Sequence, residues 1–381
     1  MEHRSFMFDL NELSTIKYRD YVLNLLRSRG RDAEKFLGEY LIRLRKKEPR
    51  IRRELLNGRD LFSIRAYITG SDIHLRSLGG IDVPLRIASN SCIVCKGNDV
   101  YLYLRLSSLG GHPIPNPWSR TFIGLSRTSL DRLHGRIRLI AQPILYSTLS
   151  TERVEDPRID PEHLRELYHV RAYYTYRPID DADSFTLTFR SEIDDQGIPK
   201  SIEPVMFKDH NENLLIIRDY RDTFPLNEKF MVTRPWIEEL GVGVIMVGPR
   251  NRNVIELEGL RGYPELIPTP HERKTGGNCV IKLSSNEYLL VFHSVEAYFG
   301  TYHTYVAILS SDGELLGVSP KPVVSPRIND YYGARPATIF VCGAQLIKDE
   351  LIISAGKDDE ITLIMTASLD KVIEEVKFIK G

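Results

Sequence analysis

The stretch from Asn278 to Ser310, NCVIKLSSNEYLLVFHSVEAYFGTYHTYVAILS, contains three short apolar runs that are separated by turn-forming residues. The runs are rich in β-branched and aromatic residues, and the first two are separated by Ser284, Ser285 and Asn286. Apolar runs of this length, bounded by turn signals, are typical of β-strands joined in hairpins. The stretch therefore predicts an all-β region.

Beyond Leu61 the same pattern fills the rest of the chain. Further runs include VYLYLRL (100–106), VRAYYTYR (170–177), TIFVCGAQLI (338–347) and ITLIMTAS (361–368). They recur every ~8–12 residues, which favours an all-β fold over alternating strands and helices. Four-stranded blades around a channel are one such fold, and about five blades fit residues 80–381. The spacing alone leaves a propeller and a pair of sandwiches as alternatives.

The first part of the chain carries apolar residues at helical spacing. Gly30 is a natural stop between two such runs, and Pro49 interrupts the second. Basic residues are frequent here, but few aromatic residues accompany them, so a solvated helical face is favoured over a nucleic-acid-binding arm. We predict a helical extension over residues 1–80 that packs on the main domain or on a second subunit of a homo-oligomer. The predicted apolar positions are Ile16, Val22, Leu23, Leu26, Phe36, Leu37, Leu41, Ile42 and Leu44.

Composition bounds the partners and the location of the protein. Lys+Arg and Asp+Glu both total 51 among 381 residues, so no global charge attracts nucleic acid or an acidic membrane. No apolar run approaches the ~20 residues that cross a bilayer. The N-terminus, MEHRSFMFDL, is charged from its second residue and lacks the apolar core of a signal peptide. We therefore expect a cytoplasmic protein without nucleic-acid or membrane partners.

Four cysteines raise the question of a metal or redox site. Cys92-x-x-Cys95 has the spacing of half a zinc site, but no second Cys or His pair stands at a matching spacing. The surrounding segment, SCIVC, is more typical of an apolar strand. We therefore expect buried thiols, no metal and no cofactor.

Two segments carry residues suited to acid catalysis and to sugar binding. RVEDPRI, from Arg153 to Ile159, places Glu155 and Asp156 on opposite faces of an extended chain, so that one of them can face a channel. A hairpin near the C-terminus ends in the acidic pair Asp358 and Asp359. A salt-bridged turn and an ordinary acidic turn are the alternative interpretations.

A further segment carries residues suited to anion binding. Lys274 precedes Gly276 and Gly277, where the backbone can approach a ligand closely, and His293 lies on the next predicted strand. A Lys and a His at neighbouring strand ends can both face an anion such as phosphate. A charged loop beside a core histidine is the alternative.

Taken in order, these segments resemble glycoside-hydrolase family 130, the β-mannoside phosphorylases and mannosidases. The resemblance covers roughly residues 85–375 and implies a five-bladed β-propeller catalytic domain over residues 81–381. It rests on EDPR at Glu155–Arg158, TRPW at Thr233–Trp236, KTGG at Lys274–Gly277, FHSV at Phe292–Val295, IFVCGA at Ile339–Ala344 and SAGKDD at Ser354–Asp359.

The resemblance also implies roles for individual residues. Asp156 matches the catalytic acid of the family. Residues similar to those that bind the sugar are Asn90, Arg105, Arg158 and Asp359. Residues that resemble or follow the phosphate-binding segments are Arg177, Arg190, Arg234, Lys274 and His293.

The implied reaction is phosphorolysis of a β-mannoside with inversion, giving mannose 1-phosphate. Asp156 would supply a proton through a mannose hydroxyl, and inorganic phosphate would be the co-substrate. A β-mannosidase is the alternative; it would need a second carboxylate ~6.5–9.5 Å from the acid, and Glu155, Asp222 and Glu296 are candidates.

A non-catalytic glycan-binding propeller is a third interpretation, favoured by departures from the family's motifs. Ser294 stands where the family has Gly, Lys357 adds a charge, and FPLNEKF shifts the acid and Lys that follow Pro225. The loop Gly110–Arg120, GGHPIPNPWSR, is expected at the channel mouth and is this protein's own.

Overall fold

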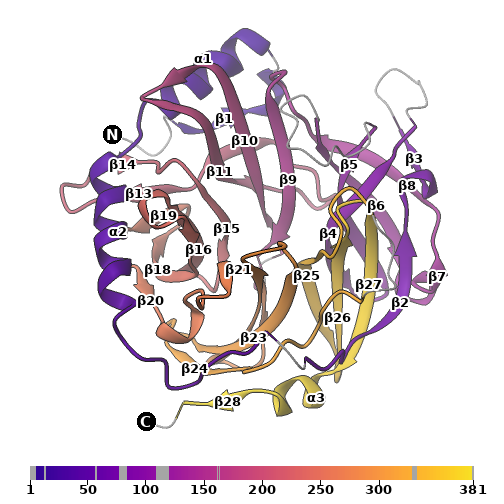
Figure 1. Cartoon of the computed structure of the whole chain (residues 1–381). Coiled ribbons are helices and arrows are strands. Elements are labelled where there is room, and N and C mark those ends of the chain that lie inside the picture. The colour runs from indigo at the N-terminus through magenta and orange to yellow at the C-terminus, as the bar shows by residue number, and fades with distance from the viewer. Residues whose placement is uncertain are drawn as a thin grey trace.

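The computed structural model describes residues 6–12, 14–55, 58–76, 84–108, 120–160, 162, 164–327 and 333–379. Among these residues β-strands predominate, as Figure 1 shows, so the prediction of a mostly β protein is confirmed. Within the same ranges, none of the helices combines the length and the apolar character that crossing a membrane requires. The loop predicted at Gly110–Arg120 lies outside the described residues, except for Arg120.

Three of the four sheets have five strands each. One has the order β1-β12-β11-β10-β9, with the bounds Phe8–Asp9, Ser201–Pro204, Ala182–Glu192, Glu166–Ile179 and Glu152–Ile159. The next has the order β25-β26-β27-β2-β7, with the bounds Ile339–Ile347, Glu350–Lys357, Ile361–Ser368, Ser63–Ile68 and Gly135–Arg136. The third has the order β3-β8-β6-β5-β4, with the bounds Ile73–Leu75, Leu139–Leu145, Phe122–Ser129, Asp99–Ser107 and Ile87–Lys96.

The fourth sheet has 13 strands and falls into two parts. One part contains β13 to β16 and β18 to β20, with the bounds Met206–Lys208, Leu214–Leu215, Tyr220–Pro225, Phe230–Ile237, Met246–Asn251, Val254–Glu256 and Arg261–Gly262. The other contains β17, β21 to β24 and β28, with the bounds Val242–Gly243, Glu272–Lys282, Glu287–Glu296, Tyr302–Ser310, Leu315–Val318 and Lys377–Phe378. The short strand β17 joins them, because it pairs with β16 and also, through Gly243 and Lys274, with β21.

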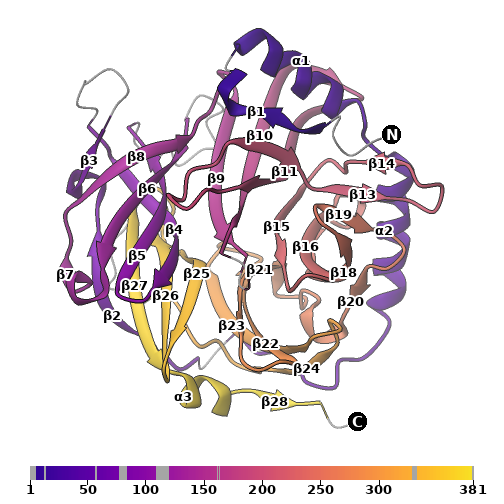
Figure 2. The ribbon, with the colours of Figure 1, turned by 180° about the vertical axis from the view of Figure 1, so that it is seen from behind.

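The sheets stand around a common centre, and β4, β9, β15, β21 and β25 lie nearest to it (Figures 1 and 2). Pairing of each of these strands with its neighbour shifts register near the centre. Such β-bulges bend a strand and re-aim its side chains. At three of them the backbone φ is positive: 45° at Asn90, 52° at Asp156 and 54° at Asp222.

The two N-terminal helices, α1 (Thr15–Leu26) and α2 (Arg31–Leu44), lie against the outside of the sheets (Figure 1). Ser14 caps α1 by accepting a hydrogen bond from the backbone of Lys17, at 3.4 Å. The apolar residues of the two helices that pack into the main hydrophobic core are Tyr18, Val22, Leu25, Leu26, Ala33, Leu37, Leu41 and Leu44. Two of the positions predicted for the apolar stripe face solvent instead: Ile16 is 64% exposed and Ile42 is 46% exposed.

The segment predicted as a helical extension, residues 1–80, also contributes strands to three sheets. Its strand β2 pairs with β27 near the C-terminus, β3 pairs with β8, and β1 pairs with β12. Among the residues that the structure describes, the remaining helices are α3 (Leu369–Glu374) and five short 3-10 helices at Leu10–Glu12, Gly70–Asp72, Leu130–Arg132, Glu238–Leu240 and Pro264–Leu266. The N-terminal segment is therefore part of the β-sheets as well as of the outer helical layer.

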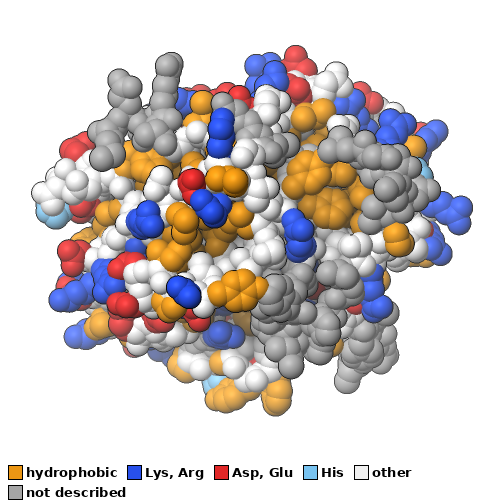
Figure 3. Space-filling model, turned by 90° about the horizontal axis from the view of Figure 1, so that it is seen from above, with side chains coloured by type: hydrophobic (Ala, Val, Ile, Leu, Met, Phe, Trp, Pro, Cys, Tyr) orange, Lys and Arg blue, Asp and Glu red, His pale blue; other side chains and the backbone are white. Residues whose placement is uncertain are grey.

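Surface charge is mixed, as the zero net charge predicts. Figure 3 shows basic and acidic side chains interspersed over one face, with hydrophobic patches between them. Interspersed charges of both signs produce no strong field of a single sign over this face.

The neighbouring residues Leu41 and Ile42 test how α2 is anchored. Leu41→Ala removes a fully buried side chain and should lower the free energy of unfolding by about 2–5 kcal/mol. Ile42→Ala removes a half-exposed side chain of the same volume and should cost less than about 1 kcal/mol. Urea unfolding of both variants measures the difference; equal losses would contradict the packing described for α2.

Candidate active site

A pocket of about 260 Å³ opens where the inner strands converge. Most of its lining is polar, and the charged lining residues comprise six basic and four acidic side chains. The lining residues are Asn90, Arg105, Arg153, Glu155, Asp156, Tyr174, Arg221, Asp222, Arg234, Lys274, Tyr302, Arg335, Thr338, Phe340 and Asp359. A concave site with convergent polar groups is the usual form of a small-molecule binding site.

Four residues predicted from separate motifs meet at one end of this pocket. Asn90 donates a hydrogen bond from Nδ2 to Oδ1 of Asp156, at 2.7 Å. Arg105 donates from Nη2 to Oδ1 of Asp359, at 2.9 Å, and its Nη1 lies 3.7 Å from Oδ1 of Asp156. The side chain of Asp156 remains 10% exposed and faces the pocket. The structure therefore brings a carboxylic acid together with an amide, a guanidinium and a second carboxylate, which suit the hydroxyl groups of a sugar.

Backbone geometry places the side chains at this end. Asn90 and Asp156 both adopt positive φ at bulges, and such strain persists where the surrounding structure holds it. A side chain on Gly356 would bring its Cβ within 1.7 Å of Oδ1 of Asn90, so glycine is required there. Asp358 and Asp359 form the turn between β26 and β27, with φ values of 52° and 56°.

Asp359 is held as a carboxylate. Burial alone would raise its pKa, but the guanidinium groups of Arg105 and Arg335 hold the pKa of Asp359 below its usual value. The turn is fixed from behind, because Asp358 accepts hydrogen bonds from Lys357, at 3.1 Å, and from the backbone of Thr338, at 3.3 Å. An ionised acceptor in a fixed turn can bind a sugar hydroxyl.

Positive charge gathers at the other end of the pocket, around Arg234 and Lys274, and Arg221 and Arg335 extend it toward Asp156 and Asp359. Nη2 of Arg234 is buried and has no hydrogen-bond partner among the described residues. Burial, and then the neighbouring Arg234 and Arg335, hold the pKa of Lys274 well below its usual value. The ring of Tyr302 lies beneath both Lys274 and Arg335, with its centroid 5.3 Å and 4.6 Å from their charged groups. An anion bound here would satisfy Arg234 and favour the charged form of Lys274.

Asp222 organises this cationic end. Its Oδ2 accepts a hydrogen bond from Nε of Arg234, at 2.6 Å, and its Oδ1 accepts one from Nη2 of Arg158, at 2.7 Å. Although burial opposes ionisation, Arg234 and Arg158 hold the pKa of Asp222 well below its usual value. Asp222 is therefore a permanent anion that fixes two guanidinium groups.

Arg158, predicted to bind the sugar, lies behind the pocket. Its side chain is 2% exposed; besides Asp222, it donates to the backbone carbonyls of Asn278, at 2.8 Å, and Asp156, at 3.1 Å. The rings of Phe224 and Phe340 flank its guanidinium, each with its centroid 5.7 Å away. The bulge at Asp156 turns the residues that follow away from the pocket, so Arg158 supports the site from below.

His293 also lies behind the pocket, fully buried beside Gly276. Its Nδ1 is 2.9 Å from Oδ1 of Asn278, and its Nε2 is 4.0 Å from Oδ2 of Asp222. Burial, together with the positive charges of Lys274 and Arg234, holds the pKa of His293 well below its usual value, despite the attraction of Asp222. The neutral form is favoured, with a ring nitrogen directed toward Asp222.

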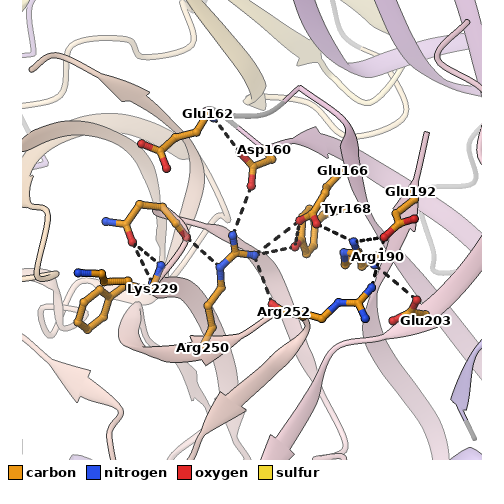
Figure 4. A network of polar contacts seen from close by, with 12 residues as sticks. Asp160, Glu162, Glu166, Tyr168, Arg190, Glu192, Glu203, Lys229, Arg250 and Arg252 are labelled. Atoms are coloured by element: carbon orange, nitrogen blue, oxygen red, sulfur yellow. Dashed lines mark hydrogen bonds and ion pairs between the residues drawn. The ribbon is translucent and has the colours of Figure 1, made fainter. Parts of the chain in front are cut away.

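Two predicted phosphate residues do not reach the pocket. Arg177 is exposed on β10, beyond the part of that strand that lines the pocket at Tyr174. Arg190 donates to Glu166, at 2.6 Å, and to Glu192, at 2.7 Å, within a separate ion-pair network that Figure 4 shows. Its charge is already neutralised there, so placing these two arginines in the site was wrong.

The structure adds cationic and aromatic residues that the sequence analysis missed. Arg221 lines the pocket and donates from Nη2 to Thr186, at 3.0 Å; Arg153, Tyr174, Tyr302 and Arg335 also line it. Arg221 directly precedes Asp222, which was considered only as a spare acid. The sequence RDTFP, in which an Arg-Asp pair begins an apolar strand, could have indicated that Arg221 belongs to the site.

The structure separates the three carboxylates that were considered as the base of a hydrolase: Glu155, Asp222 and Glu296. Glu155 lines the pocket, whereas Asp222 is tied into two ion pairs. Glu296 accepts hydrogen bonds from the backbone of Tyr298, at 2.7 Å, and Phe299, at 2.5 Å, and does not line the pocket. Of these three carboxylates, Glu155 is therefore the one that lines the pocket without being tied into ion pairs.

The four cysteines are present as free thiols. Cys92, Cys279 and Cys342 are buried, and burial raises the pKa of the Cys92 thiol to about 12. Within the part of the chain that the structure describes, no group of three His, Cys, Asp or Glu residues is arranged to hold a metal ion.

Asp222 gives a pH test of the site's stability. Its lowered pKa means that its ionised form stabilises the fold above the usual Asp pKa of about 4, and this contribution is lost as the pH falls below that value. Asp222→Asn should therefore cost about 3–5 kcal/mol at pH 7 and progressively less below pH ~4. Urea unfolding from pH 7 to pH 3 measures this.

Glu287→Gln, at an exposed carboxylate, is the matched control and should change the free energy of unfolding by less than about 0.5 kcal/mol at pH 7. A cost of Asp222→Asn that stayed constant down to pH 3 would mean that the charge of Asp222 is not what holds the two arginines.

A family of carbohydrate-active enzymes and several solved structures are similar to this chain. The family model of glycoside-hydrolase family 130, described as beta-1,4-mannooligosaccharide phosphorylase, matches residues 243–378. This match confirms the resemblance predicted from the sequence motifs. None of the curated protein sequences matches the chain.

Several solved structures share the fold. A β-1,2-mannobiose phosphorylase from Listeria innocua, in complex with β-1,2-mannobiose, has a TM-score of 0.57 at 15% identity, over 77% of this chain and 92% of that chain. A mannose phosphorylase from Leishmania mexicana, in complex with phosphate ion, has a TM-score of 0.50 at 12% identity, over 84% and 92%.

A third structure is described as showing that the family of mannoside phosphorylases contains hydrolases that target β-1,2 mannosidic linkages in Candida mannan. It has a TM-score of 0.52 at 12% identity, over 81% of this chain and 95% of that chain. At these identities the structures establish a common fold, and the family model adds the type of chemistry. Over residues 243–378 the chain is therefore similar to glycoside-hydrolase family 130, which supports an enzyme of the glycoside phosphorylase or hydrolase type.

Proposed function

We propose that this protein is a five-bladed β-propeller that cleaves β-mannosides with inorganic phosphate, with inversion, to give mannose 1-phosphate. Support for five blades comes from the five bulged strands around one centre and from the 13-stranded sheet, whose two parts are joined through the short strand β17. On this proposal each part of that sheet is one blade.

The observation that carries phosphorolysis is the division of the pocket into two chemically different ends. The end with Asp156, Asn90 and Asp359 offers acceptors and an acid for a sugar. The end with Arg234 and Lys274 offers buried positive charge, including an unpaired guanidinium nitrogen. Phosphate fits the second end, because guanidinium and ammonium groups form strong charge-assisted hydrogen bonds with phosphate oxygens.

Asp156 acts as the general acid in the proposed reaction. Its proton passes, by way of a mannose hydroxyl, to the oxygen of the leaving group as the glycosidic bond breaks. A phosphate oxygen then forms the new bond at the anomeric carbon from the opposite face, which inverts the configuration. Phosphate is already a nucleophile, so no enzymic base is required, and the arginines neutralise its charge.

A β-mannosidase is the second candidate, and one observation favours it. Glu155 lines the pocket beside Asp156 and is free of the ion pairs that bind Asp222. In a hydrolase Glu155 would activate a water, and Glu155→Gln would then abolish sugar release in phosphate-free buffer. A non-catalytic glycan-binding propeller would consume neither the β-mannoside nor inorganic phosphate.

We further propose a cytoplasmic location, an oligosaccharide or mannoside as the substrate, and phosphate without any cofactor. Subunit contacts remain a prediction; Ile16 and Ile42 on the outer faces of the N-terminal helices are the apolar residues available for them. Light scattering of the full chain gives the oligomeric state.

The acid is tested by Asp156→Asn, which keeps the size of the side chain but cannot deliver a proton. General acid catalysis contributes about 10²–10⁴-fold, so kcat should fall by about that factor. Affinity for the mannoside should largely survive, as calorimetry with a β-mannobiose can measure. Full activity in this variant would remove Asp156 from the mechanism.

The anion site is tested by Lys274→Ala. Loss of one charge-assisted contact of roughly 1.5–3 kcal/mol should weaken the apparent affinity for phosphate by about one to two decades, with little change in the KM for the mannoside. Arg177→Ala removes a basic residue outside the pocket and is the matched control, with no expected change. Initial rates at varied phosphate measure both. An unchanged KM for phosphate in Lys274→Ala would argue against this anion site.

A further inference from the structure

Exposed aromatic side chains stand at one turn of the molecule. Tyr298 is 74% exposed and Phe299 is 91% exposed, and both lie in the short turn between β22 and β23. Large aromatic rings that face water together are uncommon and frequently mark a binding surface.

The turn that presents them is held in one conformation. The carboxylate of Glu296 accepts the backbone N–H groups of Tyr298, at 2.7 Å, and Phe299, at 2.5 Å. Gly300 follows with a φ of 76°, which closes the turn. The two rings are therefore carried by an ordered backbone, which lowers the entropic cost of binding.

This turn stands beside the mouth of the pocket. The backbone N–H of Ala297 donates to His271, at 2.9 Å, just before β21, the strand whose Lys274 lines the pocket. Tyr302, which begins β23 and also lines the pocket, donates its backbone N–H to Ala337, at 3.1 Å. The turn is thus adjacent to two strands that contribute to the pocket wall, β21 through Lys274 and β23 through Tyr302.

A further aromatic residue lines the same pocket from another sheet. It is Tyr174 of β10, whose ring lies 5.3 Å from the guanidinium of Arg153, itself a lining residue. Aromatic residues of two sheets, Tyr174 and Tyr302, therefore line the pocket.

We propose that Tyr298 and Phe299 form a stacking platform for sugar units beyond the cleaved bond, and that the preferred substrate is an oligosaccharide of at least three units. This inference rests on the proposed function. The sugar that loses its bond occupies the end with Asp156 and Asp359, so the leaving part of the chain passes out through the mouth. The C–H faces of its pyranose rings can cover the aromatic rings while its hydroxyl groups stay in water.

The experiment compares the double variant Tyr298→Ala/Phe299→Ala with Phe378→Ala, which removes an exposed aromatic side chain on β28, at the C-terminal edge of its sheet. A β-linked mannobiose and the mannotetraose of the same linkage are assayed with inorganic phosphate. If the two rings carry the binding of the outer sugar units, as hot-spot aromatics do, their joint removal should lower kcat/KM for the tetraose about tenfold, or about 1.4 kcal/mol. The value for the biose should be unchanged, and Phe378→Ala should alter neither.

A binding measurement tests the stacking platform independently of the proposed phosphorolysis. Calorimetry of mannotetraose with the unmutated chain and the double variant reports the platform even where no product forms. A tenfold weaker affinity in the double variant supports the platform, and a wild type that binds but never forms mannose 1-phosphate refutes only the phosphorylase. Equal effects on biose and tetraose, or no effect on the tetraose, would overturn the platform. A fall in molar mass in the double variant would assign the turn to a subunit contact and also overturn it.

Discussion

The buried ion pairs of Asp222 with Arg158 and Arg234 are the interaction on which the centre of this protein depends. One carboxylate accepts hydrogen bonds from two guanidinium groups, at 2.7 and 2.6 Å, with all three side chains at most 2% exposed. Removing one member of such a buried cluster leaves an uncompensated buried charge, so each of the three side chains is needed for the stability of the other two. Arg158 also holds the backbone carbonyls of Asp156 and Asn278, which joins three inner strands at one point.

This shared support explains why the two ends of the pocket keep fixed positions relative to each other. Asp156 lies on a bulge whose backbone Arg158 holds, and Arg234 is oriented by the same Asp222 that holds Arg158. Asp156 and the cationic residues of the pocket are thus held by one buried network rather than by two loops. Preorganised positive charge of this kind requires no rearrangement when a charged substrate arrives, which is the main way in which enzymes stabilise charge during reaction.

Much of the fold and part of the site could be predicted from the sequence, because those parts are encoded locally. Strand spacing predicted the β class, and the ordered motifs led to Asn90, Arg105, Asp156 and Asp359, which the structure brings together. Arg190 could not be excluded, since its neutralising partners lie on other strands. Arg158 points behind the pocket because of the bulge at Asp156, and simple strand alternation does not reveal a bulge. Likewise, Ile16 and Ile42 fit a helical stripe, but the face that packs is set by the sheets beneath.

The central claim, that one pocket joins a sugar end to a phosphate end, is tested most directly by phosphorus NMR of the product. The wild-type protein is incubated with a β-linked mannobiose and inorganic phosphate, and the anomeric configuration of any sugar phosphate is determined. The account predicts mannose 1-phosphate of the α configuration, formed in step with loss of inorganic phosphate. Release of mannose at the same rate without phosphate, and with no phosphate ester formed, would contradict it.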